Sequence, residues 1–322
     1  MTPFGTLRDG RAVHAIPLSA GDLSVTILTY GAVIQSVTLA GSEHSLTPTS
    51  DRIEDWENGT LVYDGALVGP VANRIKGARA SLDGAEIAFE ANQEALHTLH
   101  SGSAGVHIKV WDVLDEGPDF VVLGLDLPAG EGNFPGNRQI RARFEVLAPA
   151  TIRMTLTGTT DAPTFLNLCN HGSWNLDGTQ NWTGHRMWID AEHYLPTDET
   201  AAPTREIASV AGTDMDFRTE RSFGNGAPAM DHNFCLSDGP RPLREVLRLT
   251  GASGTSLTLA TTEPGVQIFD GRKGKIPYRA IAIEAQGWPD AANQPAFPSI
   301  VLEPGETYRT ITEWRFARGP QA

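Results

Sequence analysis

Cysteine is rare in this sequence, and its basic residues are dispersed. Only Cys169 and Cys235 occur among the 322 residues, too few for a disulfide framework or a zinc site of four thiolates. The formal net charge is -14, from 25 lysines and arginines against 39 acidic residues. Because no run of basic residues offsets this charge locally, we expect neither nucleic acid nor an anionic membrane as a partner.

Long apolar segments are absent as well. The stretch from Met1 to Gly10 carries Arg8 and Asp9 and lacks the apolar run of a signal peptide. No later segment approaches the length of a transmembrane helix. Together with the low cysteine content, which suits a reducing compartment, these features predict a cytoplasmic protein.

Three familiar catalytic motifs do not occur. The sequence has no glycine-rich phosphate loop between a strand and a helix, no His-Glu-x-x-His sequence and no serine in a Gly-x-Ser-x-Gly turn. Their absence argues against a nucleotide-binding protein, a zincin protease and an α/β-hydrolase.

Alternation of apolar and polar residues dominates over helical periodicity. Apolar side chains occupy every second position over 139–146 and 152–157, and a similar alternation recurs over 308–316. This period of two is typical of strands with one buried face. We therefore expect an all-β protein, although periodicity alone does not choose between a sandwich of two large sheets and a barrel.

Glycine and proline punctuate these strands without forming a linker. The 33 glycines and 21 prolines are scattered, and turns are expected at Asp83-Gly84 and Asn225-Gly226. One short helix is expected over Asp51–Asn58, with Asp51 as its N-cap. No boundary divides the chain, so we expect a single domain over residues 1–322.

Five polar clusters in apolar or uncharged surroundings are the candidates for chemistry. They span residues 71–75, 98–102, 167–171, 231–234 and 281–290. In the last cluster, Glu284 interrupts an apolar strand. A carboxylate on the solvated face of a half-buried strand is the commoner explanation, and a catalytic carboxylate is the alternative.

Histidines are the second group of candidates. His171 lies among asparagines and a serine, and it is either satisfied by backbone groups or an acid, because histidine titrates near neutrality. His97 and His100 are close in sequence, but no carboxylate or further histidine nearby completes a ligand set, so no metal is expected. A hydrogen bond to a ligand suits His100 better.

Three further polar residues have two explanations each. Arg74 forms a surface ion pair or binds a ligand. Asp231 forms a turn or acts in a site. Gln267 is the polar member of a strand or a binding residue. None of the three decides a function by itself.

Taken in order, the five clusters resemble the galactose mutarotase family of aldose 1-epimerases. That family's pattern includes an Ala-Asn-Arg-Ile run, a Leu-His-Gly-Gly run and an Asn-His run. The likeness covers nearly the whole chain and is most specific over Glu284–Pro298 and Leu302–Tyr308. It implies a large antiparallel β-sandwich with an open cleft for a sugar, and so favours a sandwich over a barrel.

The resemblance also implies roles and partners. Glu284 resembles the family's general base and His171 its general acid. The residues that resemble its sugar-binding side chains are Asn73, Arg74, His100, Asp231 and Gln267. The expected activity is cofactor-independent interconversion of the α and β anomers of a free hexose or pentose, by a monomer or a homodimer.

The sequence departs from the family pattern at three places. Pro70 replaces an arginine, Ser101 replaces a glycine, and Ser173-Trp174 stands where Tyr-Phe is common. These positions neighbour the binding residues, so galactose, glucose, xylose and arabinose all remain candidates. The alternatives are a relative acting on hexose 6-phosphates, a non-catalytic sugar-binding protein, and a glycosidase that uses Glu284 with Asp231.

Overall fold

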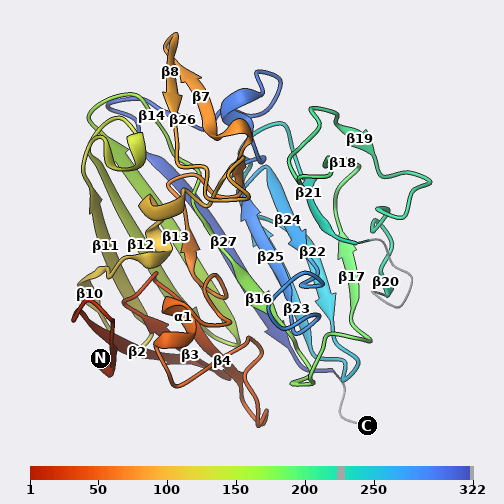
Figure 1. The fold of residues 1–322 in the computed structure, drawn as a ribbon. Coiled ribbons are helices and arrows are strands. Elements are labelled where there is room, and N and C mark those ends of the chain that lie inside the picture. The colour runs from red at the N-terminus through yellow and green to blue at the C-terminus, as the bar shows by residue number, and fades with distance from the viewer. Residues whose placement is uncertain (223–228, 320–322) are drawn as a thin grey trace.

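Three antiparallel sheets contain most of the strands (Figure 1). The computed structural model describes residues 1–222 and 229–319. The turn expected at Asn225-Gly226 lies outside the described residues, whereas Asp83-Gly84 joins β7 (Arg79–Leu82) to β8 (Ala85–Ala88). The prediction of an all-β protein is confirmed.

The largest sheet has nine strands among the described residues. In spatial order they are β10 (Asp112–Glu116), β11 (Phe120–Leu127), β12 (Arg138–Leu147), β13 (Thr151–Thr160), β27 (Tyr308–Ala317), β23 (Ser256–Thr261), β22 (Arg244–Thr250), β17 (Arg186–Ile189) and β20 (Arg221–Ser222). The three segments with predicted alternation lie in β12, β13 and β27, which are neighbours at the centre of this sheet.

Two smaller sheets accompany it. The six-stranded sheet runs in the order β16 (Gly172–Trp174), β25 (Ile281–Gln286), β24 (Gly265–Phe269), β21 (Asp231–Cys235), β18 (His193–Leu195) and β19 (Ala208–Ser209). The four-stranded sheet comprises β1 (Thr2–Thr6), β2 (Ala12–Ala20), β3 (Leu23–Leu28) and β4 (Ile34–Leu39).

Short elements connect these sheets. Two-stranded ladders pair β14 (Thr164–Phe165) with β26 (Val301–Leu302), β15 (Cys169–Asn170) with β5 (Leu67–Val68), and β6 (Arg74–Ile75) with β9 (Thr98–Leu99). Single 3₁₀ turns occur at Lys76–Ala78, Gly102–Ala104, Val106–Ile108, Glu131–Asn133 and Ala291–Asn293. Within the described residues, no helix combines the length and the apolar character needed to cross a membrane.

The sheets form two layers around one large core. Ile140 and Phe144 of β12 and Trp314 of β27 project from the nine-stranded sheet, and they belong to the same buried cluster as Leu18 of β2 and Ile283 of β25. The four-stranded and six-stranded sheets thus cover the nine-stranded sheet side by side. Burial of each leucine, isoleucine or phenylalanine side chain in this cluster contributes about 1.5–3 kcal/mol relative to leaving it exposed. The sandwich expected from the family resemblance is confirmed.

Strand β25 is buried on both of its faces. Ile281, Ile283 and Ala285 belong to the core cluster. Since successive side chains of a strand point to opposite faces, Ala282 and Glu284 point away from the core. The outer face of the six-stranded sheet therefore presents a carboxylate where it is covered by loops from residues 59–100.

The helix expected over Asp51–Asn58 is shorter than predicted, and its predicted N-cap is wrong. Helix α1 covers Glu54–Glu57, its N-cap position is Ile53, and no side chain caps it. Ser50 instead organises this segment, because its Oγ donates to Asp55 Oδ2 (2.5 Å) and accepts from the backbone N–H of Arg52 (3.1 Å). Asp51 is left exposed in the preceding bend.

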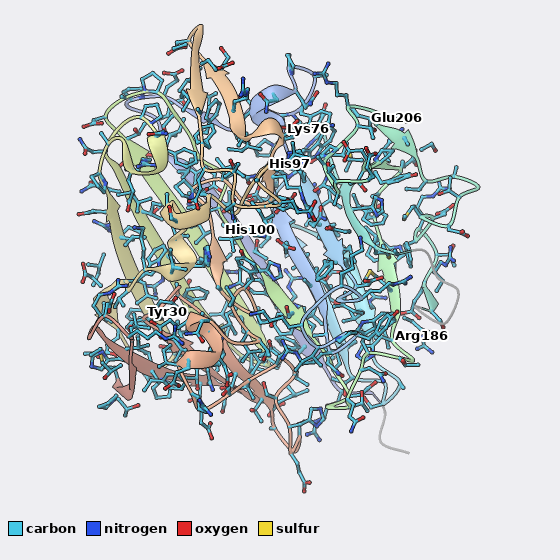
Figure 2. The ribbon with its side chains drawn as sticks, viewed as in Figure 1. Tyr30, Lys76, His97, His100, Arg186 and Glu206 are labelled. Carbon is cyan, nitrogen blue, oxygen red and sulfur yellow. The ribbon has the colours of Figure 1, made fainter. Side chains whose placement is uncertain are left out.

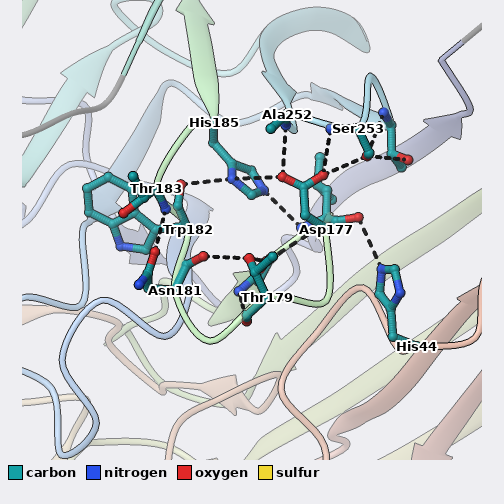
Figure 3. A network of polar contacts seen from close by, with 12 residues as sticks. His44, Asp177, Thr179, Asn181, Trp182, Thr183, His185, Ala252 and Ser253 are labelled. Carbon is teal, nitrogen blue, oxygen red and sulfur yellow. Dashed lines mark hydrogen bonds and ion pairs between the residues drawn. The ribbon is translucent and has the colours of Figure 1, made fainter.

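Asp177 joins the loop after β16 to the turn between β22 and β23 (Figure 3). Its Oδ2 accepts from the N–H of Ala252 (2.8 Å), and its Oδ1 accepts from the N–H (3.0 Å) and Oγ (2.6 Å) of Ser253. Burial opposes ionisation of this carboxyl, but the hydrogen bonds outweigh burial and lower the pKa of Asp177. The resulting stabilisation is present at neutral pH and is lost as the pH falls through the lowered pKa.

We expect Asp177→Asn to lower the free energy of unfolding at neutral pH by about 1–3 kcal/mol, because the amide cannot accept all three hydrogen bonds. Denaturant unfolding measures this loss. Asp238→Asn is the matched control, since Asp238 is 86% exposed and forms a surface ion pair with Arg241. Equal stability of the two variants would contradict a tethering role for Asp177.

Candidate active site

A cleft of about 370 Å³ lies on the outer face of the six-stranded sheet. Strands β21, β24 and β25 and the loops around residues 59–64, 99–100 and 271–280 contribute its lining. Six of the seven residues proposed from the sequence line it: Asn73, Arg74, His100, His171, Asp231 and Glu284. Positions separated by more than 200 residues along the chain thus meet in one cavity.

Glu284 and His171 face each other in this cleft. Glu284 is only 2% exposed, and its Oε1 lies 3.5 Å from Nε2 of His171. Burial raises the pKa of Glu284 above its ordinary value, and the neighbouring His171 opposes that rise. A carboxylate with a raised pKa is a stronger proton acceptor than an exposed one, and a histidine beside it can carry the complementary proton.

The main chain on both sides of His171 is fixed. The N–H of His171 donates to the carbonyl of Ala66 (2.8 Å), and its carbonyl accepts from the N–H of Gly65 (2.8 Å). The side chain of Asn170 donates to the Gly65 carbonyl (2.6 Å). The ring of Tyr63 stacks on the imidazole, with centroids 5.7 Å apart and planes inclined by 28°. The backbone contacts fix the start of the His171 side chain, and the Tyr63 ring lies against one face of the imidazole.

His100 is held by a reciprocal pair of hydrogen bonds with Asn73. The N–H of Asn73 donates to Nδ1 of His100 (3.1 Å), and the N–H of His100 donates to the Asn73 carbonyl (2.9 Å). Both residues adopt positive φ, 58° for Asn73 and 49° for His100. Such backbone conformations are uncommon for residues other than glycine and concentrate at functional sites.

The tautomer of His100 follows from this contact. Because Nδ1 accepts a hydrogen bond, the ring proton lies on Nε2. Burial, reinforced by His171 and His107, lowers the pKa of His100 well below its ordinary value, so the ring is neutral. His100 therefore presents an Nε2–H donor to the cleft.

His100, His171 and Glu284 are close enough to suggest a metal site, with ligand atoms within 4.8 Å of one another. A histidine binds a metal through an unprotonated ring nitrogen. His100 has its proton on Nε2 and its Nδ1 occupied by Asn73, so only two of the three groups can act as ligands. This donor set does not fit a resident cation.

We expect prolonged dialysis against a chelator to leave the activity of the protein unchanged, because two remaining ligands do not complete a coordination shell. The initial rate of the catalysed reaction, measured before and after dialysis, tests this expectation. A sample dialysed against buffer alone is the control. Loss of activity that a divalent cation restores would show that the tautomer assigned to His100 is wrong.

Arg74 and Asp231 form an ion pair within the cleft. Arg74 Nη2 lies 3.2 Å from Asp231 Oδ2, and Arg74 Nε donates to Gln93 Oε1 (2.9 Å). The seventh proposed residue, Gln267, does not line the cleft: it is 2% exposed, and its amide donates to Asp231 Oδ1 (2.6 Å). Gln267 therefore orients Asp231 without lining the cleft itself, and each carboxylate oxygen of Asp231 accepts a hydrogen bond from one side chain.

The other polar residues singled out in the sequence have structural contacts. His97, which Figure 2 labels together with Lys76 and His100, accepts from the Gly77 N–H (3.0 Å) and contacts Thr200 Oγ1 (2.8 Å). Ser101 Oγ accepts from the Val71 N–H (2.9 Å) and donates to the Val71 carbonyl (3.2 Å), which anchors the loop of His100.

Three residues near Glu284 and His171 were not predicted from the sequence. Tyr63 contacts the rings of His100, His107 and His171. Cys169 lies beside Glu284, and although it falls within the cluster at 167–171, the sequence assigns it no role in a site. Lys273 lines the cleft from the loop that follows β24. Tyr63 and Lys273 lie in loops and carry no local signal of a site, and the cluster around Cys169 drew attention through His171.

Comparison with known proteins gives consistent matches over almost the whole chain. The family model described as aldose 1-epimerase matches residues 14–315. The galactose mutarotase of Rattus norvegicus is 33% identical over 340 residues, which cover 98% of both chains. The aldose 1-epimerase of Escherichia coli (strain K12) is 29% identical over 337 residues, with 96% of both chains covered.

Solved structures give the same result. A GalM/aldose epimerase homologue from C. elegans superimposes with a TM-score of 0.88 at 27% identity, covering 96% of this chain and 100% of its own. A galactose 1-epimerase from Lactobacillus acidophilus superimposes with a TM-score of 0.85 at 25% identity, covering 98% of this chain and 97% of its own.

Proposed function

The chain belongs to the aldose 1-epimerase family of carbohydrate isomerases, and we propose that it interconverts the α and β anomers of a free hexose or pentose without a cofactor. The observation that carries this proposal is the approach of Glu284 and His171 to 3.5 Å inside the cleft. A base and an acid so placed can act on two oxygens bonded to the same carbon, which is what opening a sugar ring requires.

In the proposed reaction, ionised Glu284 removes the proton from the C1 hydroxyl while protonated His171 gives a proton to the ring oxygen O5. The C1–O5 bond breaks, and O1 becomes the oxygen of an aldehyde. Rotation about the C1–C2 bond presents the other face of the aldehyde to the O5 hydroxyl. His171 then takes back the O5 proton and Glu284 returns its proton to O1, so closure yields the other anomer and restores both residues.

The remaining polar residues hold the sugar during this cycle. A free aldose offers many hydroxyl groups and little apolar surface, so fixed donors and acceptors must position it. The Nε2–H of His100 and the Arg74–Asp231 pair supply these at the cleft wall. Asn73 contributes through its contact with His100, and Gln267 contributes by orienting Asp231.

A neutral sugar fits the charges of the cleft better than a sugar phosphate. Arg74 is paired with Asp231, and Arg279 with Asp64. Lys275 Nζ donates to the backbone carbonyl of Gly59 (2.5 Å). Among the described lysines and arginines that line the cleft, these contacts leave one, Lys273, for a phosphate dianion, which usually requires several cationic donors.

Glycoside hydrolysis fits the cleft less well than anomer interconversion. A glycosidase needs a carboxylic acid that protonates the leaving group and a second carboxylate. Asp231 accepts hydrogen bonds on Oδ1 from Gln267 and on Oδ2 from Arg74. Both oxygens of Asp231 are thus engaged by protein donors, and the side chain that faces Oε1 of Glu284 is His171, so the cleft pairs a carboxylate with a histidine where a glycosidase needs two free carboxyl groups.

Polarimetry tests the proposed function and ranks the substrates. Freshly dissolved α-D-glucose, α-D-galactose, α-D-xylose and L-arabinose are each mixed with a catalytic amount of the protein. The decay of optical rotation is compared with the spontaneous decay in the same buffer. We expect acceleration for at least one sugar. Folded protein that accelerates none of them would reject the proposal.

A further inference from the structure

Cys169 lies directly beside the proposed base. The side chain is fully buried on β15, and its Sγ lies 3.7 Å from Oε2 of Glu284 and 3.6 Å from Oε1 of Gln286. Glu284 and Gln286 are two residues apart on β25 and therefore point to the same side of the strand. The thiol thus faces two acceptors from one neighbouring strand.

The thiol is a donor in this position. Burial raises the pKa of Cys169 well above its ordinary value, and Glu284 and Glu263 raise it further. The sulfur therefore keeps its proton at neutral pH. One S–H can serve one acceptor at a time, and an ionised carboxylate accepts more strongly than an amide oxygen. Glu284 is accordingly its preferred partner whenever Glu284 is ionised.

The two oxygens of Glu284 have different surroundings. Oε1 faces His171, and Oε2 faces Cys169. Within residues 1–222 and 229–319, no other side chain donates to Oε2. A carboxylate held at one oxygen presents the other in a fixed direction. Without that contact, the approach of His171 to Oε1 remains, but rotation about the terminal torsion, which is broad for glutamate, is less restricted.

We propose that Cys169 is a positioning residue, whose S–H holds Oε2 of Glu284 and keeps Oε1 turned toward His171 and the sugar. The inference rests on the proposed function, because it gives Glu284 the role of the base. It concerns the orientation of that base, and Cys169 itself does not touch the substrate or react.

The backbone that carries Cys169 is anchored from the opposite side. The hydroxyl of Tyr308 accepts from the Leu168 N–H (3.1 Å), and it lies 3.2 Å from the Leu168 carbonyl and 3.3 Å from Glu263 Oε1. Burial raises the pKa of Glu263 to about 7. Tyr308, which also contacts Glu263, thus holds the backbone of Leu168, the residue before Cys169. This contact limits movement of the thiol.

Several titratable groups contribute to a pH profile of this site. Those that act on Glu284 are His171, Asp231, Cys169 and Arg74. Those that act on Cys169 are Glu284 and Glu263. A change in the profile is therefore assigned to the thiol only by comparing variants that leave all the other groups in place.

The experiment compares Cys169→Ala with Cys169→Ser in the mutarotation assay. Alanine and serine leave similar space, but only serine keeps a donor. We expect Cys169→Ala to lower kcat roughly three- to tenfold, the range of an ordinary hydrogen bond, with KM changed little. The acidic limb of its kcat profile shifts to higher pH, because the ionised form of Glu284 loses a donor. Cys169→Ser restores both properties.

Cys235→Ala is the matched control, since Cys235 is also buried and unpaired but packs with Leu195, Trp288 and Phe297 away from the cleft. Cys235→Ala keeps the wild-type profile. Equal kcat values and profiles for Cys169→Ala and Cys169→Ser would overturn the proposal, because any loss would then come from packing.

Glu284→Gln in the same assay separates this inference from the proposed function. If Glu284→Gln is inactive and Cys169→Ala matches the wild type, the positioning role of Cys169 is rejected but the proposed function is not. Wild-type turnover in Glu284→Gln rejects the proposed function itself, and the role of Cys169 with it.

Discussion

Replacement of Glu284 by glutamine is expected to lower kcat for anomer interconversion by roughly two to four orders of magnitude, the contribution typical of a positioned general base. Glutamine has nearly the same shape and still accepts a hydrogen bond from Cys169, but it cannot take the proton of the C1 hydroxyl. We therefore expect KM to change much less than kcat. Initial rates of polarimetric decay over a range of sugar concentrations measure both.

The pH dependence of kcat in the wild-type protein tests the role of Glu284 independently. Activity requires ionised Glu284, and burial raises its pKa. The rate should therefore fall on the acidic side at a higher pH than an ordinary glutamate would give, and Glu284→Gln should lose this limb. A Glu284→Gln variant that unfolds like the wild type and turns over at the wild-type rate would show that the base lies elsewhere.

Replacement of His171 by asparagine is expected to reduce kcat by a similar factor, roughly a hundredfold or more, because O5 must then take its proton from water. Asparagine keeps a polar side chain at a position where the backbone is held by Gly65 and Ala66. The fold should therefore be unaffected, which circular dichroism and thermal unfolding check. The assay is again polarimetric decay.

His193→Asn is the matched control for this variant. His193 lies exposed on β18 and does not line the cleft, so the same substitution there should leave kcat unchanged. If His171→Asn and His193→Asn retained equal activity, the acid role of His171 would be excluded.

Strands β12, β13 and β27 of the large sheet were predictable because their environment is simple. The alternation over 139–146 corresponds to β12, where one face meets the core and the other faces solvent. The strand of Glu284 was harder to interpret, because β25 is buried on both faces and its carboxylate is covered by loops. Alternation of apolar and polar residues indicates one face toward the core and one toward solvent. It does not predict a second face that loops cover to form a cleft.

The site was only partly predictable for a related reason. Glu284, His171 and Asp231 had several explanations each as isolated residues, and their resemblance to a family pattern brought them together. The contacts of Tyr63 and Cys169 arise from pairings between distant segments, such as β5 with β15. The hydrogen bond from Gln267 to Asp231 depends on the register between β21 and β24. Local sequence predicts neither the pairing of distant strands nor their register.

The sharpest test of the proposed mechanism follows both the anomers and the C1 oxygen in one sample. The α anomer of the best substrate is prepared with ¹³C at C1 and ¹⁸O in the C1 hydroxyl, and ¹³C spectra are recorded after adding the protein in ordinary water. Ring opening at C1–O5 predicts that the anomers equilibrate faster than the spontaneous rate while the ¹⁸O stays on C1. Loss of the label in step with equilibration, or equilibration no faster than without protein, would contradict it.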